Sequence, residues 1–342
     1  MKLSPLTRRR WENFKTKKRG YFSFWIISTL MVLSLFAEFL ANDKPVIMAY
    51  EGVIYLPVLR TYSESTFGGV FETEADYRSE SVQHLIEDGD GWMLWPPIPY
   101  SFDTIDWNTE GAVPEAPSNR HWLGTDDIGR DVTARIIYGF RLSVIFGLIL
   151  TFLSALIGIT VGATQGYFGG LVDLIGQRVV EIWAGLPVLF LIIILTSLFE
   201  PNPLALLLVL LLFNWMALVA VVRAEFLRTR NFDYVDAAKA LGEKDFVIMW
   251  KYILPNAMVA TLTFLPFLVS GSITTLTSLD FLGFGLPAGH PSLGELLAQG
   301  KANIQAPWLG LAGFFTLATM LTLLVFVGEG VRDAFDPRRS AT

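Results

Sequence analysis

The 342-residue sequence contains no cysteine, which excludes disulfide bonds and thiolate metal sites. Its three histidines, His84, His121 and His290, are far apart and predict no metal cluster. Charged residues make up only 17% and hydrophobic residues 52%, with a mean hydropathy of +0.47. That composition is too apolar for a soluble enzyme of this length and is typical of a multi-span membrane protein. A phosphate loop of the Gly-x-x-x-x-Gly-Lys-Ser/Thr kind is also missing, so the chain does not resemble an ATPase.

The first 41 residues combine a basic end with an apolar run. Residues 1–20 hold eight lysines and arginines against the single acidic residue Glu12, and residues 21–41 are apolar except for Glu38. The run is long for a signal peptide. We interpret it as an uncleaved first membrane span whose basic end lies in the cytoplasm, the side that retains Lys and Arg.

Residues 42–138 form the one long polar region of the sequence. They contain 17 acidic and 6 basic residues, a net charge of −11, which leaves +5 for the rest of the chain. An acidic segment after a span with a basic inner end is expected in the periplasm. Its four tryptophans and clustered prolines predict a small, loop-rich subdomain. The acidity fits a solvated face or a binding surface, and the solvated face is the simpler interpretation.

Five further apolar segments of about 20 residues follow, each long enough to cross about 30 Å of hydrocarbon as a helix. They are Leu142–Ala163, Val179–Phe199, Pro203–Val222, Met258–Leu279 and Leu309–Gly328. Backbone groups find no partners in lipid, so these spans must be helices. Residues 139–342 are therefore expected to form the core of an all-α membrane protein with six transmembrane helices. The Gly- and Pro-rich Phe281–Pro291 and the following Leu293–Ala298 are too short to span and predict a re-entrant or interfacial segment.

Counting spans from an inside N-terminus gives the topology. It places the loop 223–256 and the C-terminal tail inside, and the loop 280–308 outside. The first of these loops holds six lysines and arginines, whereas the outside loop holds only Lys301. This distribution follows the positive-inside pattern, so both termini are expected in the cytoplasm.

The inside loop 223–256 carries the first motif. Its characteristic residues are, in order, Asp236, Ala237, Ala238, Gly242, Leu254 and Pro255. Asp233 is the expected N-cap of a helix that Gly242 ends, since glycine adopts the left-handed cap conformation. A second helical run, Asp245–Ile253, is expected to stop at Pro255. The result is a short helix–turn–helix outside the membrane, with small side chains that let another surface approach closely.

A second motif ends the acidic region. Residues 121–132 are His-Trp-Leu-Gly-Thr-Asp-Asp-Ile-Gly-Arg-Asp-Val. The carboxylates and Arg130 allow an active site or a divalent-cation site. They equally allow a glycine-turned segment whose charges pair with each other at the membrane surface.

Together the two motifs resemble the permease subunits of ABC importers. Asp-Ala-Ala, three residues, Gly and a distal Leu-Pro is similar to the cytoplasmic signature loop of that family, in which the first residue is usually Glu. Residues 121–132 are similar to the Leu-Gly-Thr-Asp…Gly-Arg-Asp segment of dipeptide and oligopeptide permeases, which favours a structural role for their charges. The extended acidic loop is most like that of the Yej-type peptide permeases, associated with oligopeptide and microcin C uptake. The resemblance implies the type I ABC importer permease fold in a bacterial inner membrane.

The resemblance also implies the function and the partners. A permease of this kind catalyses nothing itself and couples ATP hydrolysis by partner subunits to peptide translocation by alternating access. ATP and Mg are bound by the partner ATPase, and no cofactor or metal is expected in this chain. The implied partners are a second homologous permease, cytoplasmic ATP-binding subunits, a periplasmic substrate-binding protein, the peptide and the lipid bilayer, with no nucleic acid. The implied coupling residues are Asp236, Ala237, Ala238, Gly242, Leu254 and Pro255.

Four hydroxyl residues are candidates for a substrate pathway. Thr263, Ser270, Thr274 and Thr277 are spaced by seven, four and three residues, which puts them near one helical face. They could line a polar path, but such hydroxyls more often bond to their own helix or hold helices together.

Two alternatives to peptide import remain. The first is a permease for another small solute, such as nickel or glutathione. The second is a membrane-embedded enzyme, which needs a nucleophile–base pair or clustered carboxylates facing a cavity. No histidine lies within an expected span.

Overall fold

The computed structural model describes residues 5–108, 111–198, 202–287 and 289–335. The chain divides into two compact units. Unit 1 comprises residues 1–28, 144–287 and 318–342, and unit 2 comprises residues 29–143 and 288–317.

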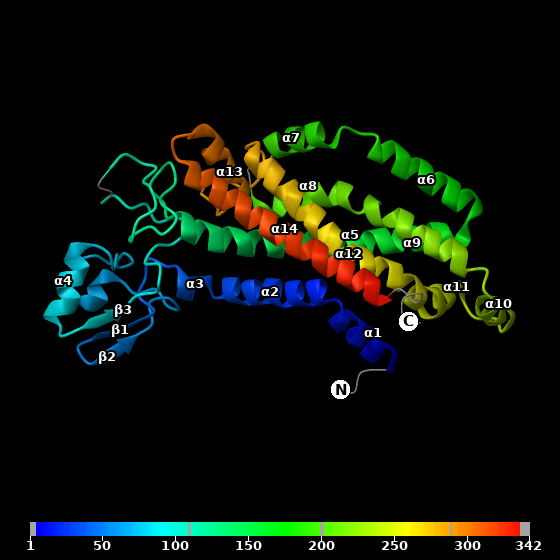
Figure 1. The fold of residues 1–342 in the computed structure, drawn as a ribbon, viewed down its shortest axis with the longest axis horizontal. Coiled ribbons are helices and arrows are strands. Elements are labelled where there is room, and N and C mark those ends of the chain that lie inside the picture. Colours follow the sequence, from blue (N-terminus) through cyan, green and yellow to red (C-terminus); the bar gives the residue numbers. More distant parts are fainter. Residues whose placement is uncertain (1–4, 109–110, 199–201, 288, 336–342) are drawn as a thin grey trace. The chain divides into compact units, whose positions relative to one another are not determined.

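The described residues are mostly helical (Figure 1). Unit 1 holds α1 (Pro5–Thr16), α6 (Gly170–Ala184), α7 (Val188–Leu198), α8 (Pro203–Asn214), α9 (Met216–Thr229), α10 (Asp233–Ala240), α11 (Asp245–Val247), a π-helical segment (Ile248–Ile253) and α12 (Leu254–Phe281). Unit 2 holds α3 (Ala37–Leu40), β1 (Ile47–Tyr50), β2 (Val53–Tyr55), a 3-10 helix (Glu64–Phe67), α4 (Glu80–Asp88), β3 (Trp92–Leu94) and α13 (Leu293–Ala302). The remaining helices α2 (Lys18–Leu35), α5 (Val132–Phe168) and α14 (Pro307–Phe335) contribute residues to both units.

Four helices in the described part of the chain are long and apolar enough to cross a membrane. They are Val132–Phe168, Pro203–Thr229, Asp245–Phe281 and Pro307–Phe335. A fifth crossing results if the bent pair Gly170–Ala184 and Val188–Leu195 counts as one span. These helices contain the second, fourth, fifth and sixth predicted spans.

The third predicted span, Val179–Phe199, is not straight. Phe199 lies outside the described residues, and before it the chain bends by 71° between α6 and α7 (Figure 1). Gly185 and Pro187 at the break account for the bend. Glycine has low helix propensity, and a proline disfavours the helical conformation of the residue before it.

The first predicted span, residues 21–41, is also interrupted. Phe36 separates α2 from α3 with φ −103° and ψ 31°. Length and hydropathy do not select α2 as a span. Its first turn carries the polar Lys18 and Arg19, which lower its mean hydropathy. By these criteria the described helices supply four or five spans rather than the predicted six.

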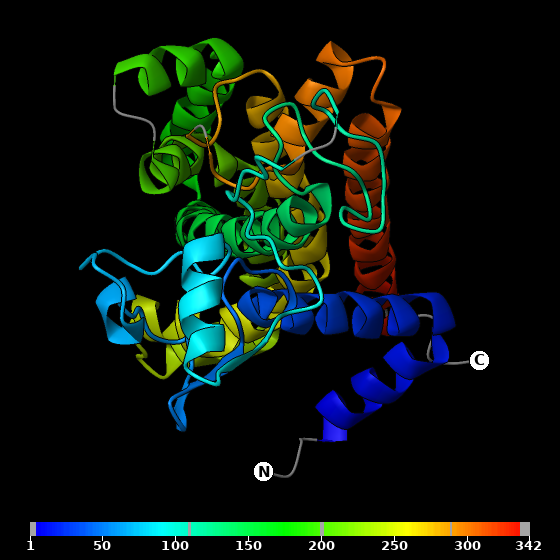
Figure 2. The same ribbon diagram turned by 90° about the vertical axis from the view of Figure 1, so that its left-hand side faces the viewer.

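The acidic region folds around a small sheet that the sequence analysis did not predict. The three antiparallel strands have the order β2-β1-β3. Glu51 and Gly52, with φ of 49° and 77°, form the two-residue turn between β1 and β2, as the twist of a tight hairpin requires. Helix α4 lies beside the strands in both views (Figures 1 and 2), and its Val82 and Ile86 are buried with Met48 of β1.

In unit 1, α5 and the α8–α9 segment approach closely because glycines recur every four residues on one face of α5. A Cβ on Gly158 would lie 2.7 Å from the carbonyl oxygen of Trp215. A Cβ on Gly162 would lie 2.8 Å from that of Val219, and Gly166 is equally crowded. Only glycine fits such contacts, which are characteristic of packed membrane helices. This packing fixes the end of α9, from which residues 230–253 continue.

Candidate functional site

Helix α10 opens the connecting loop, which we define as residues 230–253 between α9 and α12. Asp233 is the first residue of α10, and Phe232 occupies the N-cap without a side-chain cap. The predicted N-cap role of Asp233 is therefore wrong by one position. The carbonyl of Phe232 accepts the first helical hydrogen bonds, from the N–H groups of Val235 and Asp236 at 2.8 and 3.2 Å. Both aspartates still lie in the first turn, where they stabilise the positive end of the helix.

Gly242 ends α10, as predicted. Its φ is +78°, and its N–H donates to the carbonyl of Lys239 at 2.9 Å. The N–H of Glu243 donates to the carbonyl of Ala238 at 3.2 Å. This pair of hydrogen bonds is the Schellman arrangement, which needs a left-handed residue at the position of Gly242.

The second helical run does not stop at Pro255. It passes through the π-helical segment into α12, and Pro255 lies in the first turn of α12. The N–H of Leu254 donates to the carbonyl of Met249, five residues earlier. A turn widened in this way tolerates the missing N–H and the ring of the proline. The connecting loop and α12 therefore share one continuous helix from Asp245 to Phe281.

One face of α10 is buried against the chain itself. Val235 and Ala238 pack in a core with Ile248 and Ile253 of the π-helical segment. Ala238 is only 4% exposed. Its small side chain is therefore required for the packing of the loop on itself, and it does not lie on an outer docking surface as the sequence analysis assumed.

The opposite side of the loop is exposed, and we call it the exposed loop face. It consists of Asp236, Ala237, Leu241, Gly242 and Phe246. Leu241 is 83% exposed and Phe246 is 70% exposed. Large apolar side chains grouped on a polar loop mark an interaction surface. The other two motif residues lie apart from it, with Leu254 half-buried and Pro255 exposed at the start of α12.

Two side-chain hydrogen bonds hold the loop to the helices around it. The hydroxyl of Tyr167 on α5 donates to Asp245 at 2.5 Å, and Asn256 on α12 donates to the hydroxyl of Tyr234 at 2.9 Å. These hydrogen bonds attach α11 to α5 and α10 to α12.

The four candidate pathway hydroxyls do not share one environment. Ser270 and Thr277 are buried, whereas Thr274 is exposed and Thr263 is intermediate. Three of them bond to their own helix. Thr263 donates to the carbonyl of Ala260 at 2.7 Å, Ser270 to that of Pro266 at 3.1 Å and Thr274 to that of Ser270 at 2.8 Å. This is the use that the sequence analysis considered more common, and their part in a pathway stays a prediction.

A polar cluster between helices was missed by the sequence analysis. Asn214, at the end of α8, donates to the hydroxyls of Ser154 on α5 and Ser272 on α12, at 3.2 and 3.0 Å. Thr151 lies 3.3 Å from Ser272. Three helices thus meet through buried hydroxyls and one amide. The signal in the sequence was an asparagine within an apolar run.

In unit 2 the second motif forms a buried charge cluster, whose members are Asp106, His121, Asp126, Arg130, Asp131, Arg135 and Glu295. His121 is 1% exposed, with Nδ1 2.8 Å from Asp131 and Nε2 3.2 Å from Asp106. Burial opposes its protonation, but hydrogen bonds and charge from the two aspartates outweigh burial and raise the pKa of His121. For Asp106, burial is outweighed by donors such as the Asn108 N–H and the Tyr100 hydroxyl, so its pKa is lowered.

Arginines form the other half of the charge cluster. Arg130 contacts Asp126 at 2.7 Å, which confirms that charges within the motif pair with each other. Glu295 of α13 was not expected, and it accepts from Arg130 at 3.0 Å and from the fully buried Arg135 at 2.6 Å. Each carboxylate of this cluster contacts an arginine or the histidine. The pairs with Glu295 join α13 to Arg130 and to Arg135 at the start of α5.

Metal chemistry receives no support from this geometry. Within the described ranges, no group of three or more His, Asp or Glu side chains is arranged to hold a metal ion. The close pairing of carboxylates with Arg130 and Arg135 places positive charge where a cation would have to bind.

A family comparison matches more than half of the chain. Residues 154–341 match the family described as "Binding-protein-dependent transport system inner membrane component". The chain belongs to this family, whose members are the non-catalytic permease subunits of ABC transporters. The match covers the connecting loop and the helices that hold it.

Individual relatives narrow the comparison. The chain is 55% identical to the "Peptidoglycan transport system permease protein YejE" of Agrobacterium fabrum, over 98% of this chain and 94% of that one. It is 56% identical to the "Inner membrane ABC transporter permease protein YejE" of Escherichia coli, over 99% of both chains. The oligopeptide permease OppC of Haemophilus influenzae is 34% identical over 70% of this chain and 78% of its own. The predicted resemblance to the Yej-type peptide permeases is confirmed.

A solved structure agrees at the level of fold. The inward-facing methionine ABC transporter MetNI matches with a TM-score of 0.50 at 15% identity, over 59% of this chain and 96% of that one. At this identity the likeness concerns the permease fold alone.

Proposed function

We propose that the chain is one permease subunit of an ATP-driven importer of peptide-containing solutes in a bacterial inner membrane. In this proposal α2 and the bent pair α6–α7 complete six crossings. Both termini are cytoplasmic, and residues 42–138 are periplasmic. A second, homologous permease completes the pathway, a binding protein delivers the solute, and partner subunits bind ATP and Mg.

The exposed loop face is the observation that carries this proposal. It presents Leu241 and Phe246 to solvent on a helix pair that hydrogen bonds fasten to α5 and α12. An ATP-binding subunit that covers the two apolar side chains gains their burial, on the order of 1.5–3 kcal/mol each. Because the same loop continues into α12, a movement of the ATPase reaches the membrane helices directly.

The relatives support a peptide-containing solute. Their descriptions name transport of peptidoglycan, oligopeptides and dipeptides. A nickel permease is the weaker alternative, and glutathione, itself a short peptide with a γ-glutamyl linkage, is closer to the proposal. Uptake of labelled oligopeptides and muropeptides by cells with and without this gene, with nickel and glutathione as competitors, distinguishes these solutes.

Association with an ATPase is tested by a single charge on the exposed loop face. Leu241→Glu keeps the fold, since the side chain is 83% exposed, but places a carboxylate in the proposed interface. Leu59→Glu is the matched control, because Leu59 is 64% exposed in unit 2. We expect co-purification of the ATP-binding subunit to fall at least tenfold for Leu241→Glu alone, as for a charge buried without a partner. Equal recovery with both variants removes the loop from the interface.

The membrane topology is tested with the cysteine-free chain. Ser81 on α4 and Thr16 at the end of α1 are both exposed. We expect a membrane-impermeant thiol reagent, applied to cells with a permeabilised outer membrane, to label Ser81→Cys and not Thr16→Cys. The opposite pattern reverses the orientation and contradicts the proposal.

A further inference from the structure

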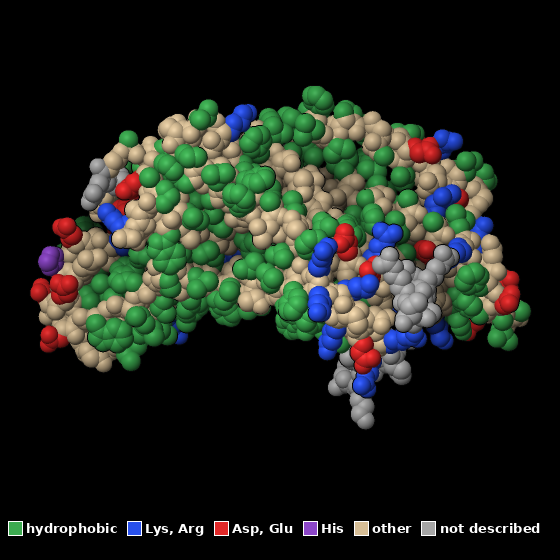
Figure 3. All heavy atoms as spheres, in the orientation of Figure 1, with side chains coloured by type: hydrophobic (Ala, Val, Ile, Leu, Met, Phe, Trp, Pro, Cys, Tyr) green, Lys and Arg blue, Asp and Glu red, His purple; other side chains and the backbone are tan. Residues whose placement is uncertain are grey.

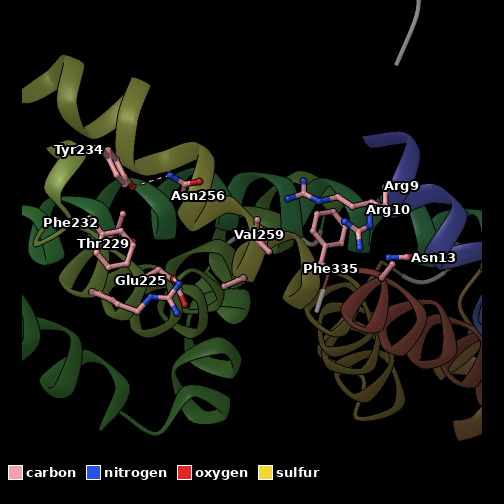
Figure 4. Close-up of a pocket in the computed structure, with 13 residues that line it drawn as sticks. Arg9, Arg10, Asn13, Glu225, Thr229, Phe232, Tyr234, Asn256, Val259 and Phe335 are labelled. Atoms are coloured by element: carbon pink, nitrogen blue, oxygen red, sulfur yellow. Dashed lines mark hydrogen bonds and ion pairs between the residues drawn. The ribbon is translucent and has the colours of Figure 1, made fainter. Parts of the chain in front are cut away.

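A basic pocket of about 620 Å³ lies in unit 1, at the ends of several helices (Figure 4). It is lined by residues of α1, of the last turn of α9, of α10, of the start of α12 and of the end of α14. Its volume is in the range of sites that hold small ligands. Neither the family match nor the motif analysis assigns it a role.

The charge of the pocket is positive. Three arginines line it, Arg9, Arg10 and Arg228, against the one carboxylate Glu225, a net charge of +2. Glu225 accepts from Arg228 at 2.6 Å, so its charge is already matched. The side chains of Arg9 and Arg10 extend from α1 towards the side on which Val259 lies (Figure 4).

The rest of the lining is uncharged and combines apolar residues with the neutral polar Asn13, Thr229, Tyr234 and Asn256. Phe232, Val259 and Phe335 supply hydrocarbon and aromatic surface. The guanidinium of Arg10 lies 4.5 Å from the centroid of the Phe335 ring, so an aromatic face holds this cation in place. The pocket therefore combines arginines, which suit a phosphate group, with apolar surface, which suits a hydrocarbon chain. A soluble inorganic anion would use only the arginines.

The position of the pocket explains this combination. The helices that end or begin there, α9, α12 and α14, are all candidate membrane spans. In the proposed topology, these helix ends lie near the level at which hydrocarbon gives way to headgroups. Lysine and arginine side chains gather over α1 and the neighbouring helix ends (Figure 3). Basic pockets between spans on the cytoplasmic side are suited to anionic lipid headgroups.

We propose that this pocket binds the phosphate of an anionic phospholipid, with Arg9 and Arg10 as the principal donors and the apolar wall against the acyl chains. The proposal rests on the membrane placement proposed above and not on transport. Tyr234, which lines the pocket, belongs to α10, and its hydroxyl accepts a hydrogen bond from Asn256 of α12. A lipid bound there joins α1 to the connecting loop and restrains the movement of α10.

Lipid binding to the purified full-length chain tests the proposal. The probes are nanodiscs of phosphatidylcholine alone and of phosphatidylcholine with phosphatidylglycerol, and retained lipid is identified by native mass spectrometry. Inorganic phosphate and glycerol phosphate, added in separate arms, distinguish a lipid site from a site for a free anion. We expect retention of phosphatidylglycerol over phosphatidylcholine and no competition by millimolar phosphate.

Variants separate a built pocket from diffuse surface charge. Arg9→Gln with Arg10→Gln is expected to weaken retention by about fivefold for each arginine removed. Arg8→Gln is the matched control on the same helix, since Arg8 does not line the pocket and pairs with Glu12 at the surface. Val259→Trp fills the pocket without a change of charge and is expected to abolish selective retention.

These measurements test the lipid site independently of the transport function. Equal weakening by Arg8→Gln, full retention by Val259→Trp, or displacement of the lipid by inorganic phosphate each overturns it. If the protein recruits no ATPase, the proposed importer function is contradicted. If lipid retention is then still lost only with the pocket variants, the lipid site is supported nonetheless.

Discussion

Replacing Gly242 by valine isolates the backbone geometry of the connecting loop. The φ of Gly242 is +78°, and a Cβ built on it meets nothing within 4 Å, so the substitution introduces backbone strain without a clash. The left-handed conformation costs an L-residue about 1–2 kcal/mol, and a β-branched residue lies at the upper end of that range. About 2 kcal/mol changes the ratio of the native turn to its alternatives by a factor of about 30.

Asparagine provides the graded comparison, because it tolerates the left-handed conformation better than other side chains. We expect Gly242→Val to lose most of the co-purified ATPase and most of the substrate-stimulated ATP hydrolysis, and Gly242→Asn to keep the larger part of both. Gly52→Val is the control. Gly52 has φ +77° and equally open surroundings, but it lies in the hairpin turn of unit 2. Normal association and turnover with Gly242→Val would falsify the role of this turn in coupling.

Three further predictions concern packing and charge. Ala238→Trp should destabilise the loop by about 3 kcal/mol through overpacking, which thermal unfolding measures. Ala237→Trp lies on the exposed loop face, so it should leave stability unchanged and weaken only the co-purification of the ATPase. Glu295→Gln removes the nearer of the two anionic partners of buried Arg135 and should destabilise the protein by about 2 kcal/mol. This is less than for a fully buried pair, because Glu295 is 30% exposed and Asp126 remains 3.5 Å away; an unchanged melting temperature argues against the pairing. Folding raises the pKa of His121, so its protonated ring should stabilise the protein fully below about pH 6.5, and this stabilisation should be lost as pH rises through the raised pKa. His121→Gln should therefore flatten the dependence of melting temperature on pH.

Local signals in the sequence predicted the features that depend on local physics. The apolar runs predicted α5 and α12. Gly242 predicted a left-handed helix end, because few other residues adopt that geometry. Pro255 was misjudged because a proline normally ends a helix, and the π-turn that absorbs it has no sequence signature. Pro187 could have predicted the bend before α7, but the continuous apolar run from Val179 favoured a single straight span.

Contacts between distant segments could not be predicted. The pairing of Arg135 with Glu295 spans 160 residues, and nothing in the spacing of the second motif indicates α13 as the partner. The burial of Ala238 depends in the same way on Ile248 and on the helices beneath it. The sequence could therefore indicate the candidate site only as a stretch of chain, whereas the choice of which of its side chains face outward required the tertiary structure.

The uninterrupted helix from Asp245 to Phe281 has a mechanical consequence. Its 37 residues form a rod about 55 Å long, at 1.5 Å per residue. A stiff rod works as a lever, so a tilt of only about 10° imposed on the end that carries Phe246 sweeps the far end through about 10 Å at this length. The regular hydrogen-bond register of this rod is interrupted by the π-turn at Ile248–Ile253 and by Pro266, which has no N–H to donate, so these are the places where the rod can bend. In the proposed topology, a small rotation at the cytoplasmic end of this helix would therefore become a larger displacement at its periplasmic end, with no separate linkage between them.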